Sequence, residues 1–438
     1  MASGTTDQSL SYDEEAQLHH RINNDKDLEP GSTPENMPPN NPAPDGGIRA
    51  WFVAGGAASI FLCTLGLANS FGTFEQYYLS HQLKGDSASK VAWTGSLQSF
   101  LQFFAGMLGG PLFDRYGSMV IYPSSVAYVF ALMMLSLCKT YWETMLVQGV
   151  LMGIVMGFLQ IPAFAAVSQY FDKKRAAALG LAVSGSSIGG IILPIILSKM
   201  LNDSSLGFAW TVRIVGFIIL PFMAFASLAV KPRLPPRKTR LFLLSPYKNT
   251  RFIMLLIALF FMFFGMFTPF FYLTTYATTR GMNVALAGYL LAIVNATSTL
   301  GRIIPGILAD KYGRLNTFAI GGIATGIIVF CMTSATTNAG LIVYAVFFGF
   351  TSGTIISGAS AAFATCPKNP QEVGTYMGMG MAVAGLGALI GPPINGAIFD
   401  ASGGFFQVCM FSGAMAVVGG FVAFAGKSLT NEGLLGWV

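Results

Sequence analysis

Arg302 is the residue whose type and surroundings point to the most specific chemistry in this sequence. It lies in an apolar stretch, residues 285–308, that contains no Asp or Glu. An arginine guanidinium can donate two parallel hydrogen bonds to a carboxylate, so an arginine without an acidic neighbour is suited to bind an anionic ligand. The alternative is a structural role, in which Arg302 bonds helix-end carbonyls or extends its charged group toward the aqueous surface.

A repeated octapeptide supplies a second group of charged candidates. The segment Gly110–Gly117 returns as Gly306–Gly313, and both copies fit the pattern G-x-L-x-D-[RK]-Y-G. Asp114 and Asp310 should lie where a helix ends, and each can accept hydrogen bonds from the unpaired amides at the start of the next helix. A short charged turn at matching places in two hydrophobic halves is typical of a duplicated membrane protein, and many secondary transporters are built in this way.

Apolar stretches of about 20 residues recur along the chain, the length that a helix needs to cross a hydrocarbon core of about 30 Å. Of the 438 residues, 53% are hydrophobic and 10% are charged, compared with roughly 25% charged in an ordinary soluble domain. The backbone in lipid must satisfy its own hydrogen bonds, so each stretch should be a helix. The sequence predicts an all-α membrane protein with twelve transmembrane helices: 50–74, 91–112, 119–138, 142–166, 176–199, 209–229, 252–277, 285–308, 316–335, 340–364, 375–398 and 406–426.

The order of these spans predicts the domain organisation. A basic cytoplasmic linker, 230–251, should separate two pseudo-symmetric six-helix bundles, 45–229 and 252–426. Residues 1–44 are acidic and too polar to offset their conformational entropy, so we expect a disordered cytoplasmic tail. Residues 427–438 should form a second, short cytoplasmic tail. The loops on the side of both termini carry most of the Lys and Arg residues, which places the termini in the cytoplasm, with the plasma membrane as the default location.

In this arrangement Arg302 lies well inside the membrane. It precedes Asp310 by about 12 Å along the helix, at about 1.5 Å per residue. Placing an arginine deep in a bilayer costs about 2.5–3.5 kcal/mol on insertion scales, so its side chain should face a cavity or a partner.

Residues 45–426 resemble the major facilitator superfamily, and parts of this region are similar to the fungal branch of the monocarboxylate-porter family. The first such segment is Asp45–Trp51 (DGGIRAW), although Ile48 departs from the aromatic that the family prefers there. The second is Tyr170–Gly189 (YFDKKRAAALGLAVSGSSIG), which is the more specific of the two. Two further similar segments are NATSTLGR, ending at Arg302, and GPPING, beginning at Gly391.

The resemblance implies a mechanical role for the repeated turn. In the superfamily such turns resemble a latch that forms when the carrier faces outward and breaks when it opens inward. Asp114 and Asp310 would then be latch residues, and Arg115 and Lys311 would bridge to neighbouring helix ends at the cytoplasmic face. The alternative is a tight turn held by its glycine.

The resemblance also implies the residues around a central cavity. The arginine at the position of Arg302 would meet a substrate carboxylate. Animal lactate carriers of the family have a lysine in the first helix and an aspartate four residues before this arginine, whereas this chain has no lysine in 50–74 and has Ser298. Glu75 is a possible proton carrier, or else an exposed helix-end acid. Further substrate-binding candidates are Asn69, Ser70, Gln160, Phe270, Tyr276 and Asn295.

These observations favour a secondary active transporter that moves a small organic anion, a monocarboxylate or an acidic metabolite, by alternating access. One alternative is an exporter of a larger, apolar fungal secondary metabolite, and another is a nutrient sensor that does not transport. We expect no enzymatic activity, no cofactor, no metal site and no nucleic-acid partner, because the sequence has no phosphate-binding loop and no nucleophile–base pair. The expected partners are the substrate, protons and the lipid bilayer, and the expected functional unit is a monomer.

Overall fold

The computed structural model describes residues 43–86, 88–202, 204–236 and 245–429, and this part of the chain is helical without a β-strand. The predicted acidic tail 1–44 lies almost entirely outside the described residues. The same is true of the centre of the predicted linker and of most of the predicted tail 427–438.

Apolar runs with few interior charges become the helices, as the cost of exposing backbone polar groups to lipid requires. In the first half of the chain the α-helices are α2 (Ile48–Ala68), α3 (Phe71–Tyr77), α4 (Ala88–Phe104), α5 (Gly106–Tyr116), α6 (Ile121–Leu135), α7 (Tyr141–Thr144), α8 (Gly153–Tyr170), α9 (Arg175–Asn202) and α10 (Gly207–Ala229). Short π-helical or 3₁₀ segments join some of them: η1 (Tyr78–Gln82), η2 (Gly117–Val120) and η3 (Met145–Met152).

The second half has longer uninterrupted helices. They are α11 (Thr250–Thr279), α12 (Val284–Tyr312), α13 (Arg314–Phe330), α14 (Asn338–Phe363), α15 (Val373–Ser402) and α16 (Phe405–Ser428). The 3₁₀ segments are η4 (Ser245–Lys248), η5 (Cys331–Ser334) and η6 (Pro370–Glu372).

Among the described residues, eleven continuous helical segments are long and apolar enough to cross a membrane. One of them, Lys90–Leu135, has 46 residues, or a length of about 69 Å at about 1.5 Å per residue. That length is more than twice a hydrocarbon core of about 30 Å. Gly117, with a φ of 59°, lies where η2 separates α5 from α6. The segment therefore contains both predicted spans 91–112 and 119–138, and the twelve predicted spans fall on eleven helical segments.

The first predicted span, 50–74, is not one continuous α-helix. Helix α2 ends at Ala68, α3 begins at Phe71, and Asn69 and Ser70 form a turn between them. Both residues of this turn are among the predicted substrate-binding residues.

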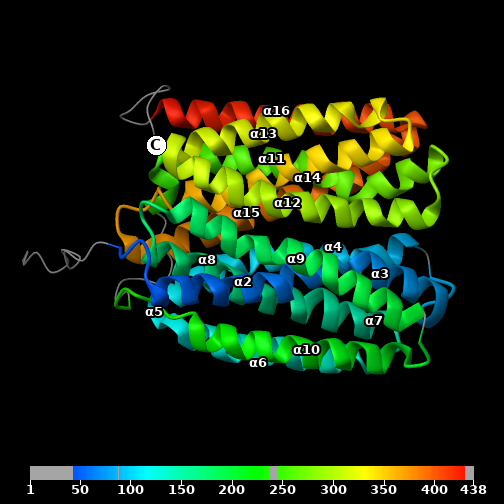
Figure 1. The fold of residues 1–438 in the computed structure, drawn as a ribbon, viewed down its shortest axis with the longest axis horizontal. Coiled ribbons are helices and arrows are strands. Elements are labelled where there is room, and N and C mark those ends of the chain that lie inside the picture. Colours follow the sequence, from blue (N-terminus) through cyan, green and yellow to red (C-terminus); the bar gives the residue numbers. More distant parts are fainter. Residues whose placement is uncertain (1–42, 87, 203, 237–244, 430–438) are drawn as a thin grey trace, which may run out of the picture. The chain divides into compact units, whose positions relative to one another are not determined.

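Helices from the two halves of the chain pack directly on each other. Helix α9 lies against α12 and α14, and α15 lies against α4, α5 and α8. Figure 1 shows the helices aligned along one direction, with α11–α16 above and α2–α10 below. The contacts between α9 and α12 position Arg302 and Asp310, and those between α5 and α15 position Asp114.

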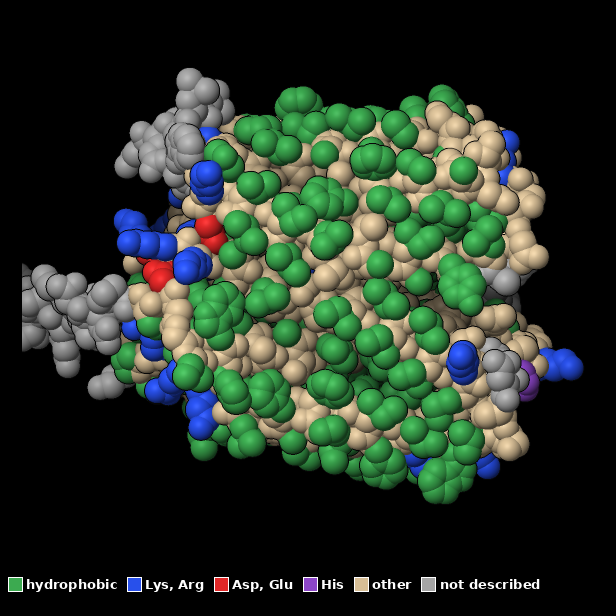
Figure 2. Space-filling model, viewed as in Figure 1, with side chains coloured by type: hydrophobic (Ala, Val, Ile, Leu, Met, Phe, Trp, Pro, Cys, Tyr) green, Lys and Arg blue, Asp and Glu red, His purple; other side chains and the backbone are tan. Residues whose placement is uncertain are grey.

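The surface matches a membrane environment. Hydrophobic side chains cover the flank seen in Figure 2, whereas Lys and Arg side chains gather at the left end and are fewer at the right end. The left end contains the turn between α5 and α6 and the carboxyl end of α16. Exposed large hydrophobic side chains of the described chain include Trp51, Leu108, Ile307, Ile320 and Phe421.

Candidate functional site

Arg302 on α12 is buried and reaches across the contact between the two halves of the chain. Its side chain is 3% exposed. One terminal nitrogen, Nη1, donates a hydrogen bond of 2.8 Å to the Val183 carbonyl oxygen on α9 and a second bond to the Ser186 hydroxyl. The Nε atom is buried and has no hydrogen-bond partner among the described residues. The guanidinium is thus neither turned toward the aqueous surface nor paired with an acid of the described chain.

The backbones of α9 and α12 are in close contact at this point. A Cβ atom on Gly180 would collide with the Arg302 carbonyl oxygen. One turn further toward the carboxyl end of α12, a Cβ on Gly306 would meet the Ala176 carbonyl oxygen at 2.7 Å. Glycines at these crossings let the two helices pack backbone to backbone.

Gln160 lies at about the same depth as Arg302. Each is about 15 Å from the carboxyl end of its helix, at about 1.5 Å per residue, which places both near the middle of a core of about 30 Å. Gln160 is 2% exposed, and its Nε2 donor is buried without a hydrogen-bond partner among the described residues. Buried polar groups normally have a partner, which can be a ligand or an ordered water.

Asn69 and Asn295 come together from opposite halves of the chain. The Asn69 side-chain nitrogen donates to the Asn295 side-chain oxygen at 3.4 Å. Both side chains also lie against Gly190 on α9, where a Cβ would meet each of them at 3.0 Å. This cluster lies about 10 Å further from the carboxyl end of α12 than Arg302 does, at about 1.5 Å per residue. The predicted residues therefore occupy two levels, a middle one and an outer one.

The other predicted substrate-binding residues make contacts within their own half. The Ser70 hydroxyl donates to the Gly66 carbonyl at 3.0 Å. Phe270 packs on Phe348, with ring centroids 5.3 Å apart. The Tyr276 hydroxyl donates to the Thr333 carbonyl at 3.0 Å, and the tyrosine ring is 1% exposed.

Glu75 lies on α3 and is half-buried. It belongs to the short helix that follows the break in the first span, at the outer end of that span.

Asp114 joins the end of α5 to the start of α15. Its carboxylate accepts hydrogen bonds from the backbone amides of Gly374 at 3.1 Å and Thr375 at 2.7 Å, and from the Thr375 hydroxyl at 2.7 Å. The carboxylate is 5% exposed. An anion at a helix start is stabilised by the unpaired amides and the positive end of the helix dipole.

Asp310 makes the matching contact at the other crossing. Its carboxylate accepts hydrogen bonds from the amides of Ala176 at 3.0 Å and Ala177 at 2.8 Å, at the start of α9. The sequence places these bonds on the next helix along the chain, and the structure instead places them on a helix of the opposite half. The reason is that α5 and α12 end beside the amino ends of α15 and α9.

Arg115 and Lys311 differ from the sequence-based expectation. The guanidinium of Arg115 lies 5.6 Å from the ring centroid of Tyr116, and the ammonium of Lys311 lies 5.2 Å from the ring centroid of Tyr312. All four side chains are exposed. Among the described residues, neither cation has a hydrogen bond to a neighbouring helix end. The reason is that successive residues of a helix point in different directions, so that when the aspartate points inward the next residue points outward.

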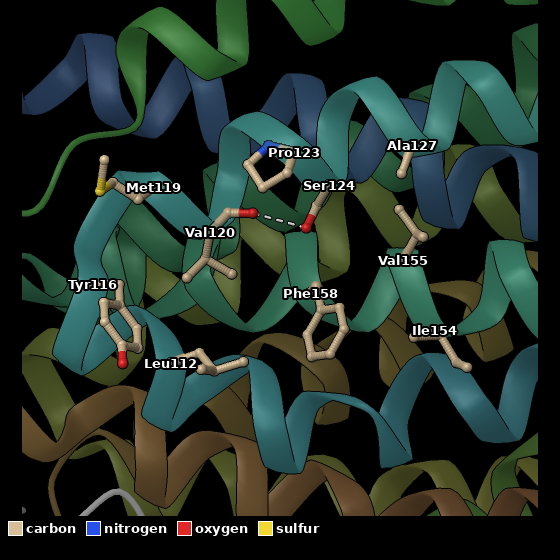
Figure 3. A pocket seen from close by; sticks show the side chains of 10 residues that line it. All are labelled: Leu112, Tyr116, Met119, Val120, Pro123, Ser124, Ala127, Ile154, Val155 and Phe158. Carbon is tan, nitrogen blue, oxygen red and sulfur yellow. Dashed lines mark hydrogen bonds between the residues drawn. The ribbon is translucent and has the colours of Figure 1, made fainter.

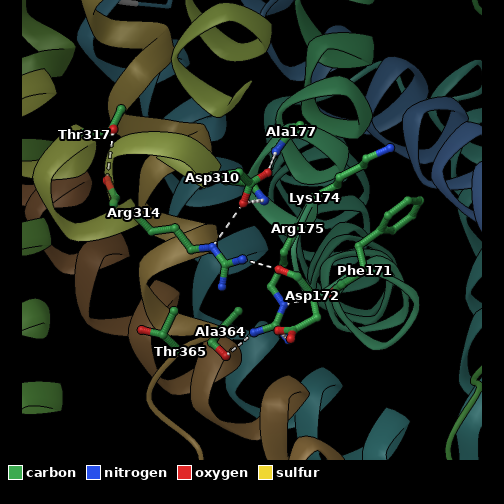
Figure 4. A network of polar contacts seen from close by, with 12 residues as sticks. Phe171, Asp172, Lys174, Arg175, Ala177, Asp310, Arg314, Thr317, Ala364 and Thr365 are labelled. Carbon is green, nitrogen blue, oxygen red and sulfur yellow. Dashed lines mark hydrogen bonds and ion pairs between the residues drawn. The ribbon is translucent and has the colours of Figure 1, made fainter. Parts of the chain in front are cut away.

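Two other arginines take the bridging role that the sequence assigns to Arg115 and Lys311 (Figure 4). The Arg314 Nε atom donates to the Asp310 carboxylate at 3.2 Å, and its Nη2 donates to the Asp172 carbonyl. Arg175 donates to the Ala364 carbonyl at 3.0 Å and pairs with the Asp172 carboxylate at 3.0 Å. The i,i+4 spacing of Asp310 and Arg314 is the sequence signal that could have identified this pair.

Asp45 connects the glycine-rich segment before the first helix to the loop after Tyr170. Its backbone has a φ of 51°, and its amide donates to the Tyr170 carbonyl at 3.1 Å. Its carboxylate accepts hydrogen bonds from the amides of Asp172 at 2.7 Å and Lys174 at 3.2 Å. The segments Asp45–Trp51 and Tyr170–Gly189 are therefore in direct contact.

Among the described residues, no group of three or more His, Cys, Asp or Glu side chains is arranged to hold a metal ion. The five cysteines are free thiols, of which only Cys331 is exposed.

Comparison with known proteins identifies the family. The profile of the Major Facilitator Superfamily matches residues 56–305 and 288–433. The aspyridones efflux protein apdF of Emericella nidulans is 51% identical over 400 residues, which cover 91% of this chain and 82% of that protein. The agnestins efflux protein AgnL12 of Paecilomyces divaricatus is 37% identical over 393 residues, covering 88% of this chain and 89% of that protein.

The fold agrees with this assignment. The crystal structure of the Major Facilitator Superfamily transporter FucP in the outward conformation matches with a TM-score of 0.65 and 16% sequence identity, covering 85% of this chain and 98% of that one. The similarity of sequence and fold extends over most of the chain, so this protein is a multi-pass membrane transporter that belongs to the Major Facilitator Superfamily.

Proposed function

We propose that this protein is a secondary active transporter that exports a secondary metabolite by alternating access. The observation that carries this proposal is its similarity to the aspyridones efflux protein, which extends over 91% of the chain at 51% identity. Aspyridones, or metabolites related to them, are the first substrates to test.

We infer further that the substrate presents an acidic group to Arg302. The Arg302 Nε atom is buried without a hydrogen-bond partner, and no carboxylate of the described chain pairs with its guanidinium. Leaving a buried charged donor unpaired costs more than leaving a neutral one unpaired, so a ligand that supplies an acceptor would be stabilised there. Gln160, at a similar depth, offers an unpaired Nε2 donor for a second contact.

The other predicted substrate residues have weaker support. Asn69 and Asn295 form the outer level of the proposed pathway and join the two halves. Phe270 would offer an aromatic surface, whereas the hydroxyls of Ser70 and Tyr276 already donate to carbonyls of the chain. Proton coupling through Glu75 stays a prediction.

The two carboxylate contacts at the cytoplasmic end support the alternating-access part of the proposal. Asp114 and Asp310 each hold the start of a helix from the opposite half. We propose that these contacts are a latch that closes the cytoplasmic side, and that both bonds break when the carrier opens inward. The bundles 45–229 and 252–426 would then move as two units about the linker 230–251.

We also propose that the similarity to the fungal monocarboxylate porters reflects a shared cytoplasmic framework. The contact between Asp45 and the loop after Tyr170 connects the two motifs that carry the similarity. The excess of basic residues at one end supports cytoplasmic termini. We propose the plasma membrane as the location, because export from the cell would require it.

Expression of the chain in a yeast strain that is sensitive to aspyridones tests the proposed function. Cells that express the protein should retain less of the added metabolite than cells that express Asp114→Lys, which reverses the charge of a latch residue. Equal accumulation in both strains, with equal amounts of protein in the membrane, would contradict export. A chain that binds the metabolite without changing its accumulation would act as a sensor instead.

A further inference from the structure

An apolar groove opens on the flank of the molecule between α5, α6 and α8 (Figure 3). Its volume is about 420 Å³, within the range of roughly 300–1,000 Å³ that is typical of ligand sites. The lining residues are Leu112, Tyr116, Met119, Val120, Pro123, Ser124, Ala127, Ile154, Val155 and Phe158. None of these is a predicted substrate-binding or latch residue.

The groove has an apolar wall. Its side-chain hydroxyls are those of Ser124 and Tyr116, and the Ser124 hydroxyl donates to the Val120 carbonyl at 2.8 Å. The rest of the lining consists of hydrocarbon side chains and the thioether of Met119. An occupant of this groove therefore gains from burying apolar surface, and forms few hydrogen bonds along the wall.

The length of the groove corresponds to one leaflet of a bilayer. It begins beside Tyr116 in the turn between α5 and α6 and reaches Ala127 on α6. From Gly117 to Ala127 the chain rises about 15 Å, at about 1.5 Å per residue. This is half of a hydrocarbon core of about 30 Å. An extended acyl chain in the leaflet next to this turn would run in the same direction as the groove and over the same length.

A cation lies at the end of the groove where a lipid headgroup would be. The Arg115 guanidinium lies 5.6 Å from the ring centroid of Tyr116, and the Tyr116 ring lines the groove. Both side chains are exposed. Tyrosine and arginine side chains at a membrane interface keep their polar ends at headgroup level. A phosphate is the complementary group for an exposed guanidinium at this position.

We propose that this groove binds an anionic phospholipid, with one acyl chain between α5, α6 and α8 and the phosphate at Arg115. In the first copy of the octapeptide, Asp114 then contacts the opposite half of the chain, whereas Arg115 and Tyr116 contact a lipid. This binding site does not depend on which metabolite the protein transports.

The second copy of the octapeptide provides a matched control. Lys311 lies 5.2 Å from the ring centroid of Tyr312, so a similar pair of cation and ring is present. Neither residue lines the groove. Removing the charge of Lys311 therefore tests a basic side chain in the same motif without changing the proposed site.

Photolabelling of the full-length protein in nanodiscs tests the proposal. The probe is a phosphatidylserine that carries a diazirine in one acyl chain, and the labelled residues are identified by mass spectrometry. We expect labelling at Met119, Ile154 and Phe158, and we expect unlabelled phosphatidylserine to compete about five-fold better than phosphatidylcholine. That ratio corresponds to about 1 kcal/mol, the contribution of one basic side chain near an anionic surface.

Three variants separate the contribution of the phosphate contact at Arg115 from that of the acyl chain in the groove. Arg115→Gln should remove the preference for phosphatidylserine, and Lys311→Gln should retain it. Ala127→Phe should fill the groove and suppress labelling at Ile154. Labelling that shows no enrichment at the groove residues would overturn the proposal, and so would equal competition by the two lipids in the unmodified protein. If Ala127→Phe fails to fold, the competition ratio in Arg115→Gln still decides the question.

Discussion

Gly180 and Arg302 lie where the backbones of α9 and α12 are in close contact, and the candidate binding group, the Arg302 guanidinium, lies at the same contact. A side chain on Gly180 would collide with the Arg302 carbonyl oxygen. At the same contact, the Arg302 guanidinium on α12 donates a hydrogen bond of 2.8 Å to the Val183 carbonyl oxygen on α9. Any movement of α9 relative to α12 therefore changes the surroundings of the guanidinium, which couples binding at Arg302 to the relative position of the two halves.

Gly180→Ala should destabilise the protein, because the added methyl group overpacks a contact between two backbones. Such overpacking typically costs about 1–3 kcal/mol. Gly288→Ala on α12 is the matched control, since no heavy atom lies within 4 Å of a Cβ at that position. It should leave stability unchanged or raise it by about 0.5–1 kcal/mol through helix propensity. Thermal unfolding in detergent measures the stability of both variants. Equal destabilisation by the two substitutions would contradict the close contact of α9 and α12 at Gly180.

Asp114→Asn and Asp310→Asn should each favour the inward-open state. Each change removes the negative charge at a helix start, a loss of up to about 2 kcal/mol in a partly buried position. A change of one or two kcal/mol corresponds to about a 5- to 30-fold shift in a two-state equilibrium. Electron–electron double resonance between spin labels at Ser118 and Lys368 should show a larger fraction of long distances in both variants.

Asp172→Asn is the control for these two substitutions. The Asp172 carboxylate also pairs with an arginine, but its side chain is 63% exposed. Exposed ion pairs contribute about 0–1 kcal/mol. The distribution of spin-label distances in Asp172→Asn should therefore stay close to that of the unmodified protein. A shift as large as that of the Asp114 and Asp310 variants would argue against a special role for these two residues.

Asp45 combines a left-handed backbone conformation with two hydrogen bonds to a loop, and three substitutions separate these effects. Asp45→Ala loses the carboxylate and is strained at a φ of 51°, with a strain of roughly 1–2 kcal/mol. Asp45→Gly loses only the carboxylate, and Asp45→Asn keeps a side-chain acceptor. We expect the melting temperature to fall least for Asn, more for Gly and most for Ala. An Ala variant as stable as the Gly variant would contradict the strained conformation.

Cys331 provides a test of the orientation in the membrane. It is the exposed one of the five cysteines, and it lies in η5, in the last turns of the predicted span 316–335, at the end opposite to the predicted cytoplasmic side. Burial raises the pKa of the Cys366 thiol, in a predicted cytoplasmic loop, to about 11. Because the thiolate is the reactive form, this cysteine should react slowly at neutral pH.

A membrane-impermeant maleimide should therefore label intact cells at Cys331, and Cys331→Ser should abolish the labelling. Labelling that requires permeabilised cells would reverse the predicted orientation.

The helices could be predicted from the sequence because lipid imposes a single solution on a long apolar stretch. The break at Asn69 and Ser70 was not predicted, because an apolar run contains no signal for a local turn. The end of a helix at Gly117, within the continuous segment Lys90–Leu135, is by contrast indicated by the octapeptide between the predicted spans 91–112 and 119–138, and the positive φ of Gly117 agrees with it.

The contacts of the candidate site were harder to predict. The repeat identified Asp114 and Asp310, but the partner helices could not be found from adjacency in sequence, because each carboxylate binds a helix from the other half. Arg175 and Arg314 were missed as bridging residues for the same reason. Arg302 was found because a charge in an apolar stretch is conspicuous, whereas its contact with Val183 depends on how α9 and α12 pack.

The most direct test of the central claim is counterflow in proteoliposomes with a matched pair of substrates, an exported acidic metabolite and its methyl ester. The unmodified protein should transport the acid much faster than the ester, and Arg302→Gln should remove this preference while Arg302→Lys retains part of it. If Arg302→Gln folds normally and discriminates between acid and ester as well as the unmodified protein does, Arg302 does not recognise an acidic group of the substrate.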